Sequence, residues 1–249
     1  MVISDIQKQV FCHIPKNGGS SLRRHLLETW ADARQYTECV PVAAANGAIR
    51  DLTHLTISEA KAYFDEDLVA KGYKILAIVR EPRARVRSAL YQYLRVVYAD
   101  QRDFIGSTDA VEFLRTVSLP ELCERSAEDY TCIHFRPQAA FIEGVPEANL
   151  ELIPLKTLGQ RFPDLPHNNP TGSLPSWLRP FDRPFIRAAF RSLGSGFRQR
   201  IRGALTRRDD AIQTEIARIA ENELEFIDTF YAADRMLYQQ VFETNHEQI

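Results

Sequence analysis

A short stretch near the start of the chain combines residue types that bind phosphate-like anions. HIPKNGGSSL, residues 13–22, follows the apolar run QVFC and precedes leucines at helical spacing. A glycine pair there lets the backbone turn tightly and points N–H groups outward, where the helix dipole also favours an anion. Lys16 adds a positive charge. The predicted anion site comprises Lys16 with Asn17, Gly18, Gly19, Ser20 and Ser21.

The residue order differs from that of the Walker A loop. In GxxxxGK[ST] the lysine follows the glycines, whereas Lys16 precedes Gly18 and Gly19. The lysine would therefore approach a bound group from the strand side of the turn. The alternative is a glycine-rich turn that carries a surface lysine.

A second basic turn follows the apolar run KILAIV, residues 74–79. Pro82 suits the start of a helix, which places Arg80 at the carboxyl edge of a sheet, where open α/β sheets bind ligands. Ser88 lies two helical turns farther on, so Arg80 and Ser88 form a second candidate phosphate site. Three further arginines follow on the same helix, Arg85, Arg87 and Arg95. The alternative to ligand binding is that they lie on a solvated helix face, and we favour that alternative for Arg87 and Arg95.

Both turns need buried strands and helices to position them. The runs 8–14 and 74–79 are typical of strands in a parallel sheet, and weaker strand candidates lie at 35–40 and 150–155. Helices are expected at 20–33, 84–98, 57–70, 109–117 and 210–242, the last with a break near Asn222. The alternation predicts an α/β fold, with a P-loop-like central parallel sheet flanked by helices, in a single domain over residues 1–249.

Composition narrows the classes of partner. The formal net charge is −2, so no whole-protein field favours nucleic acid or a membrane, and we expect no nucleic-acid partner. Arginines number 25 against 6 lysines; guanidinium suits bidentate contact with phosphate or sulfate, although genomic composition explains the bias equally well. No run approaches the roughly 18 apolar residues of a membrane span, and the first residues do not resemble a secretion signal. We expect a cytoplasmic protein without a transmembrane segment.

The cysteines give no metal-binding pattern. Cys12, Cys39, Cys123 and Cys132 form no CxxC pair and no zinc spacing with histidines, so no metal site is expected. Free thiols are expected, the alternative being a disulfide between Cys123 and Cys132. Nothing in the sequence indicates the oligomeric state.

Together the two turns resemble the cofactor-binding motifs of sulfotransferases that use 3′-phosphoadenosine 5′-phosphosulfate. The likeness is to the carbohydrate sulfotransferase group that contains the heparan sulfate 2-O-sulfotransferases and bacterial relatives, whose loops read much like HIPKTGGTSL and RNPxxRxxSxY. The matching positions here are residues 13–22, Arg80, Pro82, Arg85, Ser88 and Tyr91. The resemblance continues in THLT (53–56), HFRPQAAFI (134–142), LPHNN (165–169) and FYAADRMLY (230–238).

The resemblance implies a reaction and a ligand. Lys16 and the backbone of residues 17–21 would hold the 5′-phosphosulfate, and Arg80 with Ser88 the 3′-phosphate. The enzyme would transfer the sulfuryl group to a hydroxyl of a carbohydrate or glycolipid acceptor by in-line displacement. Glu81 stands where the family commonly has Asn, and could orient Arg80 or point into solvent.

Such a reaction needs a group for the leaving oxygen and a base for the acceptor. Lys16 suits the leaving phosphate oxygen, and histidine has the pKa of a base. His54 best matches the GHV- or GHL-like stretch of the related enzymes, although the second histidine that some of them carry is here Leu52. The alternative for His54 is capping of the following helix. His13 is expected to be a packed structural residue. The weaker candidates for the base are, in descending order, His134, His167 and His25, and His246 belongs to the tail.

Two rival functions and one basic stretch stay open. Eight arginines and no acidic residue occur in residues 183–208, which could receive a polyanionic acceptor or the 3′-phosphate, or could be a solvated face. A nucleotide-dependent phosphotransferase would use magnesium and a carboxylate near the loop. A nucleotide-binding protein without catalysis would have no turnover to lose.

Overall fold

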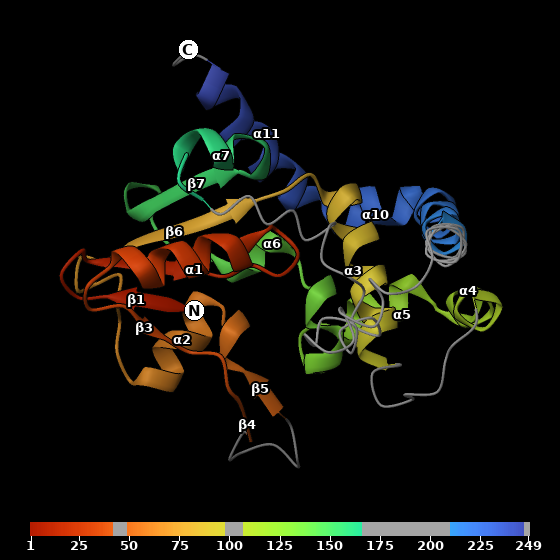
Figure 1. The fold of residues 1–249 in the computed structure, drawn as a ribbon, viewed down its shortest axis with the longest axis horizontal. Helices are drawn as coiled ribbons and strands as arrows, with labels where there is room; N and C mark the ends of the chain where they lie inside the picture. The colour runs from red at the N-terminus through yellow and green to blue at the C-terminus, as the bar shows by residue number, and fades with distance from the viewer. Residues whose placement is uncertain (42–48, 98–106, 166–209, 247–249) are drawn as a thin grey trace, which may run out of the picture.

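The computed structural model describes residues 1–41, 49–97, 107–165 and 210–246. In these ranges a five-stranded mixed sheet has the order β3-β1-β2-β6-β7 (Figure 1). Its strands are β1 (Val2–Ser4), β2 (Gln9–Cys12), β3 (Arg34–Gln35), β6 (Lys74–Val79) and β7 (Leu150–Pro154). A separate antiparallel pair comprises β4 (Cys39–Pro41) and β5 (Ile49–Asp51).

The prediction of a parallel sheet is confirmed at its centre and wrong at one edge. β2, β6 and β7 run parallel and correspond to the strands expected at 8–14, 74–79 and 150–155. β1 is antiparallel to both β2 and β3. A three-residue strand carries too little pattern to be recognised in the sequence. The strand expected at 35–40 is likewise replaced by the ends of two different short strands, β3 and β4.

Most of the expected helices form near their predicted positions. The helices are α1 (Gly19–Thr29), α2 (Ile57–Phe64), α3 (Pro82–Val97), α4 (Ser107–Thr116), α5 (Leu119–Arg125), α6 (Gln138–Phe141), α7 (Leu158–Arg161), a helix over residues 210–222, α10 (Leu224–Phe230) and α11 (Ala232–His246). The 3-10 turns are η1 (Leu52–His54), η2 (Tyr130–Phe135), η3 (Glu147–Asn149) and η4 (Leu155–Thr157). The break expected near Asn222 occurs at Glu223, and a second occurs at Tyr231.

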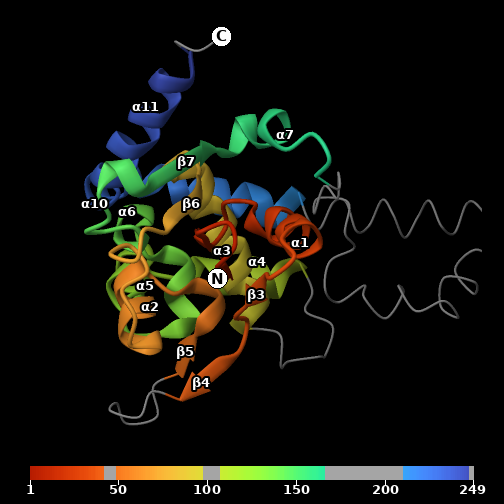
Figure 2. The same ribbon diagram turned by 90° about the vertical axis from the view of Figure 1, so that its left-hand side faces the viewer.

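The sheet is covered by helices on both faces. β6 alternates, with Ile75 and Ala77 packing against one cluster and Leu76 and Ile78 against another. Figure 2 shows α1 on one face and α2 with α6 on the other. A third apolar cluster joins α3, α4, α5 and the C-terminal helices at one end of the sheet. The described chain is thus an α/β arrangement in which α1 and α3 both start at the carboxyl edge of the parallel strands.

Three further expectations meet the described residues. All four cysteines are free thiols, as expected. No helix in the described ranges is both long enough and apolar enough to cross a membrane. Four predictions fall wholly or mostly outside the described residues. They concern the histidine at 167, the LPHNN match after its first residue, the loop expected at 163–184 and the basic stretch at 183–208.

Candidate functional site

The turn between β2 and α1 has an unusual backbone. Lys16 has a φ of 66° and Gly18 a φ of 78°, so both adopt the left-handed conformation. For a non-glycine residue this costs about 1–2 kcal/mol. Flanking contacts hold the conformation, because Arg85 Nε donates to the Pro15 carbonyl at 3.2 Å and Arg80 NH1 to the Lys16 carbonyl at 3.0 Å. The loop is therefore held in a strained shape by arginines from the second basic turn.

The two glycines are needed for different reasons. Gly18 is the N-terminal cap of α1 and supplies the positive φ. Gly19 is helical, but a Cβ there would lie 2.3 Å from His13 Cδ2. Its hydrogen is thus the only side chain that the packed imidazole tolerates.

The first turn of α1 is open to an anion. No side chain caps it and no acidic residue lies in it. Ser20 is exposed and Ser21 is half-buried. Since the N–H groups of a helix start need partners and carry partial positive charge, this end favours a bound anion.

Lys16 lies among cations. Its Nζ donates to Gln92 Oε1 at 3.2 Å. Burial first, and then the charges of the nearby Arg95 and Arg80, lower the pKa of Lys16 to about 8. A bound anion would offset this repulsion and favour the charged lysine.

Parallel pairing brings the two basic turns together. β2 and β6 pair Cys12 with Ala77, so three residues farther on Arg80 comes beside the loop. The bond from Arg80 NH1 to the Lys16 carbonyl shows the contact directly. Ser88 is half-buried on α3. The sequence prediction that Lys16 and Arg80 share one edge of the sheet is confirmed, and their ligands stay a prediction.

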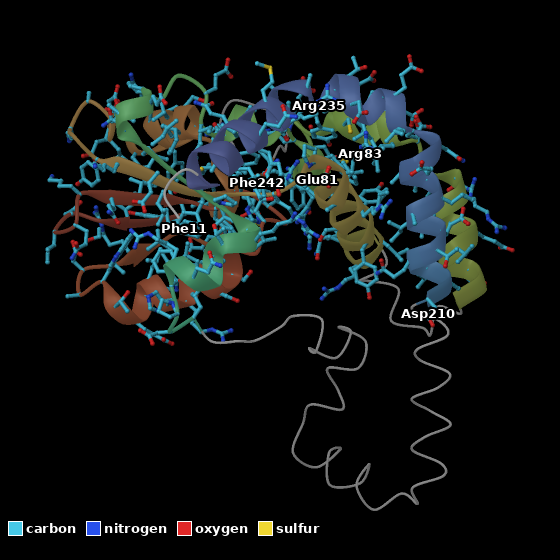
Figure 3. All side chains as sticks on the ribbon, turned by 90° about the horizontal axis from the view of Figure 1, so that it is seen from above. Phe11, Glu81, Arg83, Asp210, Arg235 and Phe242 are labelled. Carbon is cyan, nitrogen blue, oxygen red and sulfur yellow. The ribbon has the colours of Figure 1, made fainter. Side chains whose placement is uncertain are left out.

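Glu81 has a structural role other than the two considered for it, and its charge also acts on Arg80. Its carboxylate accepts from the backbone N–H of Arg83 at 2.9 Å and of Ala84 at 2.7 Å, which caps the start of α3. Figure 3 shows Glu81 beside Arg83 and Arg235 at this end of α3. The cap occupies those N–H groups, so an anion at the second turn must rely on side chains.

One face of α3 carries polar residues toward the loop. Arg85, Ser88, Gln92 and Arg95 recur at the spacing of a single helix face. Arg85 is fully buried and also donates to the carbonyl of His134 at 3.2 Å. Arg95 lies close enough to influence Lys16, and its Nε is buried without a hydrogen bond among the described residues. Arg95 is thus half-buried and only partly solvated, whereas Arg87 is exposed as expected.

His54 has one ring nitrogen available to accept a proton. Its Nδ1 lies 2.7 Å from the backbone carbonyl of His13, and a carbonyl can only accept, so Nδ1 carries the hydrogen. The lone pair is then on Nε2, which lies 3.9 Å from Asp51 Oδ2. Burial lowers the pKa of His54 to about 4, opposed by Asp51 and by the bond to His13. His54 is thus neutral at pH 7 in the tautomer of a base.

The capping alternative for His54 is wrong. Thr56 caps α2, since its hydroxyl accepts from the Glu59 N–H at 3.0 Å while the Glu59 carboxylate accepts from the Thr56 N–H at 2.8 Å. This capping box leaves the imidazole outside the helix. His54 is therefore held by the backbone carbonyl of His13 and not by α2.

Three of the six histidines pack together, and one of them, His134, lies close enough to Lys16 for their charges to interact. The His54 ring centroid lies 4.7 Å from that of His13 and 5.9 Å from that of His134. His13 is buried as expected, and burial holds its pKa well below the usual value. Burial, then the charges of His54 and Lys16, lowers the pKa of His134 to about 3. His134, the first of the weaker candidates for the base, thus lies against His54.

Other possible sites are less developed. The weaker candidate His25 packs on Phe162, with ring centroids 5.7 Å apart. Within the described residues, no group of three or more His, Cys, Asp or Glu side chains could hold a metal ion. A surface cavity of about 670 Å³ is lined by residues of the C-terminal helices and by none from the two turns: Asn222, Leu224, Glu225, Asp228, Thr229, Ala232 and Arg235.

Comparison with protein families, curated proteins and solved structures finds no match to this chain. The case for a function therefore rests on the geometry of the two turns, on the histidines beside them and on the motif resemblance.

Proposed function

We propose that this chain transfers a sulfuryl group from 3′-phosphoadenosine 5′-phosphosulfate to a hydroxyl group. The observation that carries the proposal is the direct contact between two basic turns at the carboxyl edge of parallel strands, where Arg80 holds the Lys16 carbonyl at 3.0 Å. A ligand with a charged group at each end of a nucleoside matches two such turns. A nucleoside triphosphate would concentrate its charge at one of them.

Lys16 and the first turn of α1 would receive the 5′-phosphosulfate, in a P-loop-like manner. Arg80 and Ser88 would receive the 3′-phosphate through side chains, because Glu81 occupies N–H groups at the start of α3. The backbone of Asn17 to Ser21 supplies the remaining donors. This assignment accounts for the cations around Lys16, whose mutual repulsion a doubly anchored anion would relieve.

The reaction needs one proton transfer and one displacement. The acceptor oxygen attacks sulfur as the bond from sulfur to the 5′-phosphate oxygen breaks, and His54 Nε2 takes the hydroxyl proton. Lys16 stabilises the negative charge on the leaving phosphate. His134 lies beside both groups and is the second candidate base. The acceptor, a carbohydrate or glycolipid, and a cytoplasmic location are proposed from the resemblance and from the sequence alone.

Thermal melting with nucleotides tests the proposal. Adenosine 3′,5′-bisphosphate at about 100 times its Kd should stabilise the chain by about 2.7 kcal/mol. That corresponds to a rise of roughly 5–11 °C in melting temperature for a protein of this size. AMP should raise it less. A rise only with ATP plus magnesium would refute the proposal and favour a phosphotransferase.

Turnover separates the enzyme from a binding protein. If the bisphosphate binds but the chain transfers no sulfuryl group to any hydroxyl acceptor in a carbohydrate and glycolipid screen, a non-catalytic nucleotide-binding role would account for the site. Under our proposal, activity is lost in Lys16→Ala.

A further inference from the structure

The side chain of Gln138 reaches both basic turns. Gln138 is the first residue of α6 and is fully buried. Its Oε1 accepts from Asn17 Nδ2 at 2.6 Å, in the first turn, and from the Arg80 backbone N–H at 2.9 Å, in the second. A single oxygen atom therefore joins the two turns that the proposed function assigns to the two ends of the ligand.

The amide nitrogen of Gln138 completes the pairing. Nε2 donates to the Arg80 carbonyl at 2.9 Å and to Asp234 Oδ2 at 3.3 Å. The carboxamide thus pairs with both backbone groups of Arg80, as a neighbouring strand would. The orientation of the amide is determined, because the Arg80 N–H can only donate and the Asp234 carboxylate accepts. No other residue type of this size offers the same donor and acceptor.

Gln138 is itself held from the C-terminal helix. Asp234 on α11 is fully buried, and its carboxylate accepts from the backbone N–H of Gln138 at 2.8 Å and of Ala139 at 2.9 Å. Arg85 NH1 lies 3.8 Å from the same carboxylate. α11 therefore anchors the start of α6, and α6 presents the carboxamide to the two turns.

We propose that Gln138 is a positioning residue that sets the spacing between the two anion-binding turns. The inference rests on the proposed function, since it assumes that one ligand occupies both turns. Asn17 moves with the loop that carries Lys16, and Arg80 moves with the start of α3. Because both bond to one buried atom, their separation is constrained before the ligand arrives.

A fixed spacing between the two turns affects ligand affinity in a way that a general change in stability does not. A ligand anchored at both ends binds more tightly than either half when the second contact becomes intramolecular. The gain from binding at both ends is measured by the ratio of the bisphosphate affinity to the affinity of each monophosphate. Loss of the correct spacing lowers this ratio, whereas each single-ended ligand still finds its own turn.

The experiment measures dissociation constants by calorimetry for AMP, adenosine 3′-monophosphate and adenosine 3′,5′-bisphosphate. The variants are Gln138→Met, which removes the bonds at similar volume, and Gln138→Glu, which replaces the amide donor by an acceptor. Asn149→Ala is the matched control, because Asn149 Nδ2 donates to the Tyr73 carbonyl at 3.2 Å, at the opposite end of β6. Melting curves verify that each variant is folded.

Gln138→Met should weaken the bisphosphate by roughly tenfold relative to the two monophosphates. Gln138→Glu keeps an oxygen that accepts from both turns and should retain more of this ratio than Gln138→Met. Asn149→Ala should lower the melting temperature and leave the affinity ratio unchanged. If the Gln138 variants do not fold, Asn17→Ala breaks the same link from the loop side and should lower the ratio in the same direction.

Two failures can be told apart. A wild-type chain that binds none of the three nucleotides overturns the proposed function, and this inference with it. A wild-type chain that binds the bisphosphate more tightly than either monophosphate, with the same ratio in the folded Gln138→Met or Asn17→Ala variants, overturns only the role of Gln138. Equal loss of all three affinities also overturns it, since that result indicates local damage.

Discussion

Replacing Gly19 by alanine tests whether the packing under the loop shapes the anion site. A Cβ at this position would lie 2.3 Å from His13 Cδ2 and 2.5 Å from His13 Nε2. Both distances are well below the roughly 3.5 Å of ordinary carbon contact. The imidazole has little room to move, because His13 is 5% exposed and its ring lies against those of Phe11 and His54.

The expected cost follows from overpacking. Inserting a methyl group into a filled site destabilises by about 1–3 kcal/mol. Each kcal/mol lowers the melting temperature by about 2–4 °C in a protein of this size, so Gly19→Ala should lower it by roughly 2–12 °C. The His13 carbonyl also holds His54 Nδ1 at 2.7 Å, so a displaced His13 should reduce turnover as well.

Melting with and without adenosine 3′,5′-bisphosphate measures both effects. Gly159→Ala is the control for the added methyl, because nothing lies within 4 Å of a Cβ there. Gly72→Ala is the control for backbone strain, since residue 72 has a φ of 82° and equally open surroundings. Gly159→Ala should melt like the wild type, and Gly72→Ala should lose stability without losing the ligand-induced rise.

One result would refute the reasoning. If Gly19→Ala melts within a degree or so of the wild type and keeps its full ligand-induced rise, the imidazole moves aside without cost. Gly19 would then not be required by His13, and the buried histidine would not shape the loop.

Three further predictions concern charged and titratable groups. His54→Ala should lower kcat more than donor affinity in a transfer assay, and the acidic limb of the wild-type kcat profile should lie near pH 4, where His54 takes up a proton. Bisphosphate affinity measured by calorimetry should fall as the pH rises through about 8, because Lys16 then loses its charge; a flat profile would contradict this role. Arg85→Met should destabilise the chain by about 3–5 kcal/mol in urea unfolding, since it leaves Asp234 buried beside unpaired carbonyls; a loss under 1 kcal/mol would contradict it.

Loop carbonyls help to accommodate the cations that gather at the two basic turns. Lys16, Arg80 and Arg95 lie close together, and burial lowers the pKa of both Lys16 and Arg80. Such repulsion is costly in the free protein. Backbone carbonyls of the loop accept from Arg80 and Arg85, which offsets part of that cost and stiffens the turn. The same bonds therefore serve stability and the geometry of the site.

Local patterns in the sequence were sufficient for the central strands, the main helices and the position of each basic turn after a strand. Strands β2 and β6 are mainly apolar runs, β7 is a weaker one that contains Glu151, and a glycine pair or a proline marks the helix start after the first two. Parallel neighbours then place Lys16 and Arg80 at one edge. These conclusions depend on periodicity and turn chemistry, which act over a few residues.

Contacts between distant segments decided the rest. The pairing of β1 with β3, the meeting of His134 with His54, and the reach of Gln138 to both turns depend on how the chain packs, over separations that no local pattern encodes. Packing also left Arg95 half-buried with its Nε covered, which a charged position on a helix face does not indicate by itself. The sequence alone identified the candidate residues. The tertiary structure decided which of them lie together, because side-chain partners are chosen by packing in three dimensions.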